Sequence, residues 1–376
     1  MIITKIIKKM SKLKDERELL SKPGDTILET LDQLKMSQVE LAERMGKTPP
    51  KVNDIISGKE PISITTAFQL EKVLGIDAQF WLNRELIYRE KLSRIEQEEK
   101  LEESVEWLKT QPLRELKSNG YIETAKIGSK MAEECLKFYG VASPNQWESI
   151  YVDQYISSEF RKSETHKSTL GSLAAFLRIG EIELRKLKLR NFNKELFKEN
   201  LIKIRDIIRT HPENFAMLLK NFCEEAGVAL IYTPKISKAP VSGVARWIGG
   251  NPVIQLTDRF KTNNHFWFSF FHEAGHILLH GKKDVFIENI EETEKNTAKE
   301  TQADDFANKF LLPVDVTSEL SKERVTEKEI RQIARKYNTH PAIVLGRLQH
   351  LKVVPYSFGN SLKLKVTLND IINSNG

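Results

Sequence analysis

Apolar residues in the first quarter of the chain recur at the spacing of short amphipathic helices. Two such patterns lie on either side of Gly46. Ser37 and Glu40 form a capping-box sequence at the start of the first pattern, and Pro49 falls in the first turn of the second. The inward faces are predicted to consist of Leu41, Ala42, Met45, Val52, Ile55 and Ile56. Two short helices joined by a tight turn are the arrangement of a helix-turn-helix.

The middle of the chain carries charged and helical patterns. Charges dominate residues 88–109, which predicts a solvated connecting helix. Residues 110–215 show several amphipathic helical patterns, and Gly120, Gly140 and Gly180 are expected to mark the breaks between them.

The pattern changes to strands after Gly227. Short apolar runs predict strands at 228–232, 242–247 and 252–256, with two glycines and an asparagine as the turn before the last. The run 266–271 is apolar on every side, which predicts a helix buried in a core.

The composition is that of a globular protein with more than one domain. The 376 residues exceed what one hydrophobic core usually holds. A formal charge of +6 is compatible with a nucleic-acid partner. Cys135 and Cys223 stand far apart, so we expect reduced core cysteines and a cytoplasmic protein. Residues 1–14 lack signal-peptide features, and no uncharged apolar run has membrane-spanning length.

A histidine pair at helical spacing follows the buried run. His272 and His276 are four residues apart, so both imidazoles can face one metal ion. Glu273 lies beside them, which completes the H-E-x-x-H arrangement of zinc peptidases. Five residues with three fixed also recur by chance, and the alternative is two core histidines with ordinary partners.

A catalytic zinc needs a third protein ligand, and Glu300 is the candidate. The helical pattern after it places Ala303, Phe306, Ala307 and Phe310 on an inward face that ends at Pro313. Glu300 falls on that face, where a carboxylate is costly unless it is paired or bound to metal. Asp304 is the alternative ligand or a supporting group. His280 is a supporting group, a substrate contact or an ordinary surface residue, and His265 is expected to be structural.

These residues predict hydrolysis of a peptide bond. Zinc, or manganese in its place, would activate a water molecule, and Glu273 would take its proton and pass it to the leaving amine. The strand at 252–256, or the one before it, is expected to offer an edge to an extended substrate peptide.

The outer surface of the helix-turn-helix suits DNA. We predict that residues 37–59 bind an operator and that the contacts include Lys47, Thr48, Lys51, Asn53, Ser57 and Lys59. Thr48 is also expected to cap the second helix. Asp54 and two adjacent prolines are unusual on a base-reading surface, and the alternative is a small helical bundle used for protein contacts.

A second, fainter helix-turn-helix pattern lies near the C-terminus. Thr326 and Glu329 form a capping box, an apolar stripe continues to Tyr337, and a further helix is expected at 341–351. We interpret this pair as a support for the part that carries the histidines. The sequence 362–368 alternates as an edge strand would.

The two motifs together resemble a known combination of families. Residues 37–81 are similar to an Xre-type helix-turn-helix of the HigA antitoxin kind, through the Gly58 to Ser63 sequence and the Phe80-Trp81 pair. Residues 227–351 resemble an ImmA/IrrE-family metallopeptidase domain, through Ser242-Gly243, the histidine motif and the stretch that begins at Glu300. The resemblance implies that His272, His276 and Glu300 are zinc ligands and that Glu273 is the general base.

The resemblance implies two kinds of function. Well-understood ImmA/IrrE members cleave helix-turn-helix repressors, whereas HigA-like proteins neutralise a toxin and repress their own genes. Our leading hypothesis is a DNA-binding regulator, expected to be a homodimer, whose zinc endopeptidase cleaves a repressor or a toxin–antitoxin component. The alternative is a non-proteolytic antitoxin and autorepressor with a structural or vestigial metal site. An open fourth metal position beside Glu273 favours the enzyme, because structural zinc has four protein ligands.

The predicted fold is mainly α with a small α+β zincin-like part. An N-terminal helix-turn-helix bundle and a helical middle precede a HExxH metallopeptidase domain with a short β-sheet. The expected segments are a flexible basic lead-in at 1–22, the DNA-binding domain at 23–88, a helical connector at 89–215, the peptidase domain at 216–351 and a tail with an edge strand at 352–376.

Overall fold

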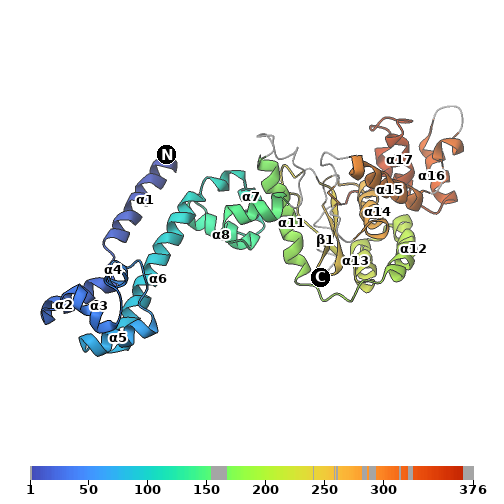
Figure 1. The fold of residues 1–376 in the computed structure, drawn as a ribbon. Helices are drawn as coiled ribbons and strands as arrows, with labels where there is room; N and C mark the ends of the chain where they lie inside the picture. The colour runs from blue at the N-terminus through green and yellow to red at the C-terminus, as the bar shows by residue number, and fades with distance from the viewer. Residues whose placement is uncertain are drawn as a thin grey trace. The chain divides into compact units, whose positions relative to one another are not determined.

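The computed structural model describes most of the chain, which divides into two compact units (Figure 1). The described residues are 2–153, 167–239, 241–257, 259, 261–281, 286–287, 294–312, 315–320 and 325–366. One unit consists of Met1–Leu108 and Thr124–Cys135, and the other of Lys109–Glu123 and Leu136–Gly376. Within the described part of the chain, none of the helices combines the length and apolar character that a membrane crossing requires.

The first unit is helical and contains the predicted helix pair. Its helices are α1 (Ile2–Glu18), α2 (Pro23–Leu34), α3 (Gln38–Met45), α4 (Pro49–Ile56), α5 (Ile64–Leu74) and α6 (Ala78–Glu103), and the 3-10 helix η1 (Trp107–Thr110) follows. Gly46 ends α3 with a φ of 66°, as the turn between α3 and α4 requires. The predicted inward residues are buried around Trp81, which is 0% exposed. Residue 88, where a connector was expected to begin, lies inside the continuous helix α6.

The first residues differ from the frayed lead-in that the sequence predicts, because they form α1. The basic side chains of α1 meet the acidic run of α6. Lys9 Nζ lies 2.8 Å from Glu98 and 2.5 Å from Glu102, and Arg17 Nη2 lies 2.7 Å from Glu99. The charges of α6 that the sequence assigned to solvent therefore have partners on α1.

The second unit places a small sheet among helices. Its elements are α7 (Leu113–Ser118), α8 (Ser129–Tyr139, which the division between the units crosses), α9 (Pro144–Trp147), the π-helical turn η2 (Glu148–Asp153), α11 (Lys167–Leu184), α12 (Lys194–Thr210), α13 (Phe215–Glu225), β1 (Ala229–Tyr232), β2 (Gly243–Ile248), β3 (Asn251–Leu256), α14 (Asn263–Leu279), β4 (Phe286–Ile287), α15 (Glu294–Leu311), η4 (Val316–Glu319), α16 (Glu327–Lys336), α17 (Pro341–His350) and η5 (Asn360–Leu362). The mainly α fold with a small α+β part is therefore confirmed. Pro313, the expected end of the helix that carries Glu300, lies outside the described residues.

The sheet has the order β1-β3-β2-β4. β3 pairs in parallel with β1 and antiparallel with β2, across a turn in which Gly249 and Gly250 have φ values of 59° and 95°. The expectation that 252–256 offers an edge is therefore wrong, because β3 has a neighbour on each side. The outer edge of β2 carries β4, which pairs at Val244 and Ala245.

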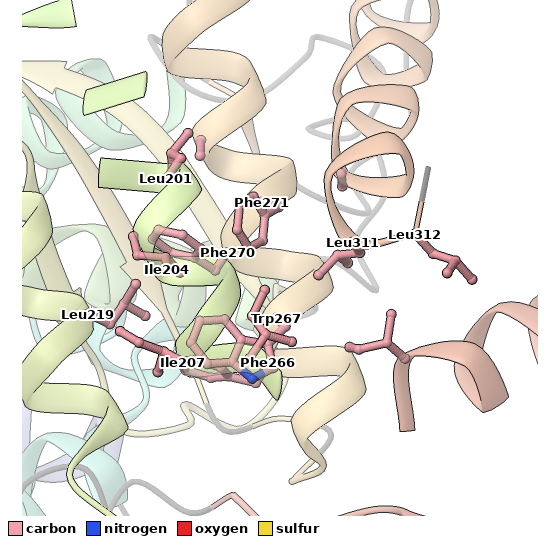
Figure 2. Packing of buried hydrophobic residues seen from close by; sticks show 14 of the residues in the cluster. Leu201, Ile204, Ile207, Leu219, Phe266, Trp267, Phe270, Phe271, Leu311 and Leu312 are labelled. Carbon is pink, nitrogen blue, oxygen red and sulfur yellow. The ribbon is translucent and has the colours of Figure 1, made fainter. Parts of the chain in front are cut away.

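Helix α14 lies on one face of the sheet and is buried along its length. Figure 2 shows Phe266, Trp267 and Phe270 of this helix packed among leucine and isoleucine side chains that include those of α12. All three aromatic side chains are at most 7% exposed. The prediction of a buried helix that leads into the histidines is confirmed.

Helix α11 is bound to the sheet through buried polar side chains. Gln255 Nε2 donates to the carbonyl oxygen of Phe176 at 2.6 Å, and Arg246 Nη2 donates to that of Leu177. The predicted break at Gly180 is wrong, because Gly180 lies inside α11. A Cβ atom at this position would lie 2.2 Å from Gln255 Oε1, so the glycine provides room for the amide. In contrast, Gly120 and Gly140 do follow helix ends, with positive φ.

Replacement of Gly180 by alanine should lower the free energy of unfolding by about 1–3 kcal/mol, the usual cost of overpacking. In an open helix the same change would be stabilising by about 1 kcal/mol. Urea unfolding followed by circular dichroism measures the difference. Gly128→Ala, just before α8, is the control for a glycine in open space, since a Cβ there meets nothing within 4 Å. Equal stability of the two variants would contradict the packing argument.

The chain after η5 pairs outside the sheet, which corrects the predicted edge strand at 362–368. Thr262 and Lys365 form a single antiparallel bridge, and Val366 N donates to Lys261 O at 3.0 Å. The tail thus pairs with the segment that precedes α14. The last two residues of the predicted strand lie outside the described residues.

Candidate metal centre and DNA-binding surface

Helix α14 presents two buried imidazoles on one face. His272 and His276 are one turn apart, and they are 3% and 2% exposed. Their Nε2 atoms lie 3.0 Å from each other. The spacing that the sequence shows therefore brings two nitrogen ligand atoms to one point in the core.

Helix α15 brings a carboxylate to the same point. Glu300 Oε2 lies 3.0 Å from His272 Nε2, and Glu300 Oε1 lies 3.3 Å from His276 Nε2. Small residues allow this approach. Ala303 is 0% exposed, and a Cβ added to Gly275 would lie 3.3 Å from the Ala303 Cα. The inward face predicted around Glu300 is the face that α15 turns toward α14.

The three residues fit a metal ion in number, type and spacing. Two imidazoles and a carboxylate are the protein ligands of many catalytic zinc sites, and tetrahedral bonds of about 2.0–2.1 Å place ligand atoms about 3.3 Å apart. The described residues offer one such group, His272, His276 and Glu300, whose ligand atoms all lie within 4.8 Å of one another. The structure therefore brings together the three residues that the sequence suggested as ligands.

Asp304 binds the other nitrogen of the first imidazole. Its Oδ1 atom lies 2.8 Å from His272 Nδ1, one turn of α15 beyond Glu300. This contact holds the ring of His272 with Nε2 toward the cluster. Carboxylates orient metal-binding histidines in the same way. Asp304 thus contacts His272 and is not one of the three residues whose ligand atoms converge. His280 Nε2 lies 3.2 Å from Lys299 O, next to the cluster but directed at the backbone.

The protonation of the cluster shows that it stabilises positive charge. Burial opposes the charged form of His272, but hydrogen bonds to Asp304 and Glu300 outweigh burial and raise its pKa to about 11. Burial lowers the pKa of His276. Despite burial, the bonds from both histidines lower the pKa of Glu300 to about 2. Side chains that favour positive charge in this way suit a metal cation.

Glu273 lies against β2, and its charge acts on His272. Its side chain is 1% exposed, and a Cβ at Gly243 would lie 2.6 Å from its Oε1 atom. Because Gly243 has no side chain, the start of β2 leaves room for the Glu273 carboxylate. The sequence carried one signal for this role, a glycine inside the predicted strand 242–247, and its significance was not recognised.

The predicted DNA-contacting residues lie on and around α4, and most of them are exposed. Thr48, Lys51, Asn53 and Lys59 are exposed, whereas Lys47 and Ser57 are half-buried. Thr48 occupies the capping position of α4, but its side chain makes no capping hydrogen bond, which corrects that expectation. Ser57 Oγ donates to the backbone at Asp54 O, 3.2 Å away. Lys51 Nζ lies 2.5 Å from Glu60.

Family comparisons match both parts of the chain. A family described as helix-turn-helix matches residues 27–81, and a peptidase M78 family described as the IrrE N-terminal-like domain matches residues 223–349. The chain joins an Xre-type helix-turn-helix domain to an IrrE/ImmA-like M78 domain. It is therefore a DNA-binding regulator fused to a domain of a metallopeptidase family, and the resemblance drawn from the sequence is confirmed.

Two curated relatives are similar over shorter stretches. An uncharacterized HTH-type transcriptional regulator, YddM, of Escherichia coli (strain K12) is 37% identical over 62 residues, which are 16% of this chain and 66% of that protein. Virulence-associated protein I of Dichelobacter nodosus is 32% identical over 72 residues, which are 19% of this chain and 67% of that protein. The chain thus spans about two thirds of the length of each relative.

A cavity of about 600 Å³ opens beside the histidines of the M78 domain. It is lined from α14, α15 and α17, and its lining includes His272, Glu300 and Asp304. The second helix pair that the sequence indicated is α16 and α17, and the Thr326–Glu329 capping box is present at the start of α16. Because α17 forms a wall of this cavity, the interpretation of the pair as a support for the M78 domain agrees with its position.

Proposed function

We propose that the M78 domain is a zinc-dependent endopeptidase and that it cleaves a regulatory protein. The observation that carries the proposal is the convergence of three ligand atoms, 3.0–3.3 Å apart, together with the buried carboxylate of Glu273, whose charge acts on His272. A structural zinc site has no use for an adjacent base, and it takes four protein ligands. Among the described residues the cluster has three.

Each residue of the site has a defined part in this function. A bound zinc ion would act as a Lewis acid toward a peptide carbonyl and lower the pKa of a water molecule. His272 and His276 would hold the ion through Nε2 and Glu300 through its carboxylate, while Asp304 holds the first imidazole in its orientation. Glu273 takes the proton of the attacking water and delivers it to the leaving amine.

The fusion to a DNA-binding domain narrows the substrate class. A peptidase tethered to a domain that binds an operator has a raised local concentration near other proteins bound to that DNA. We therefore propose a helix-turn-helix repressor, or a component of a toxin–antitoxin pair, as the substrate. Manganese is the second metal to consider, because it accepts the same imidazole and carboxylate ligands.

Metal-dependent cleavage of a regulator tests this proposal. The purified chain is incubated with zinc or manganese and with repressors encoded beside its gene, and mass spectrometry identifies the products. We expect one internal cut that a chelator prevents and that added metal restores. A chain that binds its operator and neutralises a neighbouring toxin, but cleaves none of these proteins, would instead support the non-proteolytic alternative.

The exposed face of α4 is expected to bind the operator. Replacement of Lys51 and Asn53 by alanine should weaken binding to the chain's own upstream DNA about tenfold or more, because one phosphate contact and one base contact are lost. A gel-shift titration at fixed salt measures the change. Lys72→Ala on α5 removes an exposed charge outside residues 37–59 and serves as the control. Unchanged binding by the double variant would place the DNA contacts elsewhere.

A further inference from the structure

The lining of the cavity beside the metal cluster is chemically mixed. His272, Glu300 and Asp304 belong to it, and both carboxylates are already bound to histidine nitrogens. Helix α17 also forms part of the lining, and Phe268 and Ile343 give it apolar surface. A peptide whose scissile bond lies at the histidines would therefore place a neighbouring side chain over apolar surface and against α17.

The part of the cavity wall that α17 forms carries a cation, Arg347. Ile343, Arg347 and His350 are spaced at one helical face, and all three line the cavity. Helix α17 packs closely on α14 at this point. A Cβ at Gly346 would lie 2.8 Å from the Asn264 amide nitrogen. The Arg347 side chain therefore extends from a packed helix that forms part of the cavity wall.

Within the described residues, the Arg347 side chain forms no hydrogen bond and no ion pair. The acid that its charge influences is Asp315, whose pKa is lowered first by hydrogen bonds from Thr317 and also by Arg347. The Asp315 carboxylate is engaged with Thr317, whose backbone nitrogen lies 3.0 Å and whose hydroxyl lies 2.7 Å from Oδ1. The Arg347 guanidinium is thus bound to no carboxylate in the part of the chain that the structure describes.

Other polar groups of this wall are less suited to a charged ligand. Gln349 is 1% exposed, and its amide nitrogen donates to the carbonyl oxygens of Tyr356 and Phe358 at 3.2 and 3.0 Å. Burial lowers the pKa of His265, which favours its neutral form. Arg347 is the permanently charged cation of the lining.

We propose that Arg347 determines specificity by binding an acidic side chain of the substrate, close to the scissile bond. A carboxylate forms short, charge-assisted hydrogen bonds with a guanidinium, and a lysine or arginine side chain would be repelled. The apolar lining accommodates the methylene groups of that side chain. This inference rests on the proposed peptidase function, because it takes the cavity as the place where the substrate lies.

Peptide binding to the zinc-loaded full chain tests this assignment. The Glu273→Gln background prevents turnover, and fluorescent blocked octapeptides carry Glu, Gln or Lys at each position in turn. At one position, the Glu peptide should bind about tenfold more tightly than the Gln peptide and more tightly again than the Lys peptide. Arg347→Glu should reverse the order, so that the Lys peptide binds about tenfold more tightly than the Glu peptide.

A matched charge reversal controls for long-range effects. Arg331→Glu lies on the exposed face of α16 and should leave the Glu preference as it is. Zinc content and circular dichroism establish that the variants are folded. Equal binding of Glu and Gln peptides at every position, or a Glu preference that survives Arg347→Glu, would overturn the proposal. If the preference reverses but the chain with Glu273 intact cleaves no peptide, the assignment of Arg347 stands and the peptidase function fails.

Discussion

Replacement of Glu273 by glutamine should abolish cleavage while the chain keeps its zinc. Glutamine has nearly the same shape, so it fits the space that Gly243 leaves beside β2, but it cannot accept a proton from water. Loss of a general base costs about 10²- to 10⁴-fold in rate. The rate is measured from the mass-spectrometric time course of product formation, and zinc content by atomic absorption.

A second glutamate of the same unit separates this effect from a general change of charge. Glu213 is exposed in the turn between α12 and α13, and Glu213→Gln should cleave at the rate of the unaltered chain. Cleavage by Glu273→Gln at an undiminished rate would remove Glu273 from the mechanism. Loss of zinc from Glu273→Gln would mean that Glu273 is needed to maintain the zinc site.

Replacement of Glu300 by alanine should weaken zinc binding by more than about 100-fold. This change removes one of three ligands, whereas loss of a group behind a ligand typically costs about 10- to 100-fold. Asp304→Ala is that second case, because Asp304 contacts the His272 nitrogen that faces away from the cluster. Competition titration against a chelator measures both affinities. A larger loss of zinc affinity in Asp304→Ala than in Glu300→Ala would mean that Asp304 is the metal ligand and that Glu300 is the supporting group.

The main elements of the site were predictable from local pattern. The run 266–271 is apolar on every side, and a helix of that kind has to be buried, so the histidines that follow it had to lie in or beside a core. Glu300 was recognisable as the third member because it is a carboxylate on a face otherwise made of alanine and phenylalanine. That face packs on α14, which brings Glu300 to both imidazoles.

The parts that sequence alone missed depend on contacts between distant segments. Gly180 looks like a helix break, since the Gln255 amide that requires its small size lies on a strand 75 residues away in sequence, 255 − 180. The place of Asp304 depends on which nitrogen of His272 faces the cluster, and spacing along one helix does not determine that. Arg347 was overlooked because its helix resembled a support and its cavity forms only when α14, α15 and α17 pack together.

Crystallography of the zinc-loaded chain, with anomalous scattering recorded at the zinc edge, tests the central claim most directly. The account predicts a single zinc peak bonded to His272 Nε2, His276 Nε2 and Glu300, with a solvent molecule in the fourth position beside Glu273. A peak bonded to a fourth protein side chain would show a structural site, and the absence of zinc from these three residues would contradict the account.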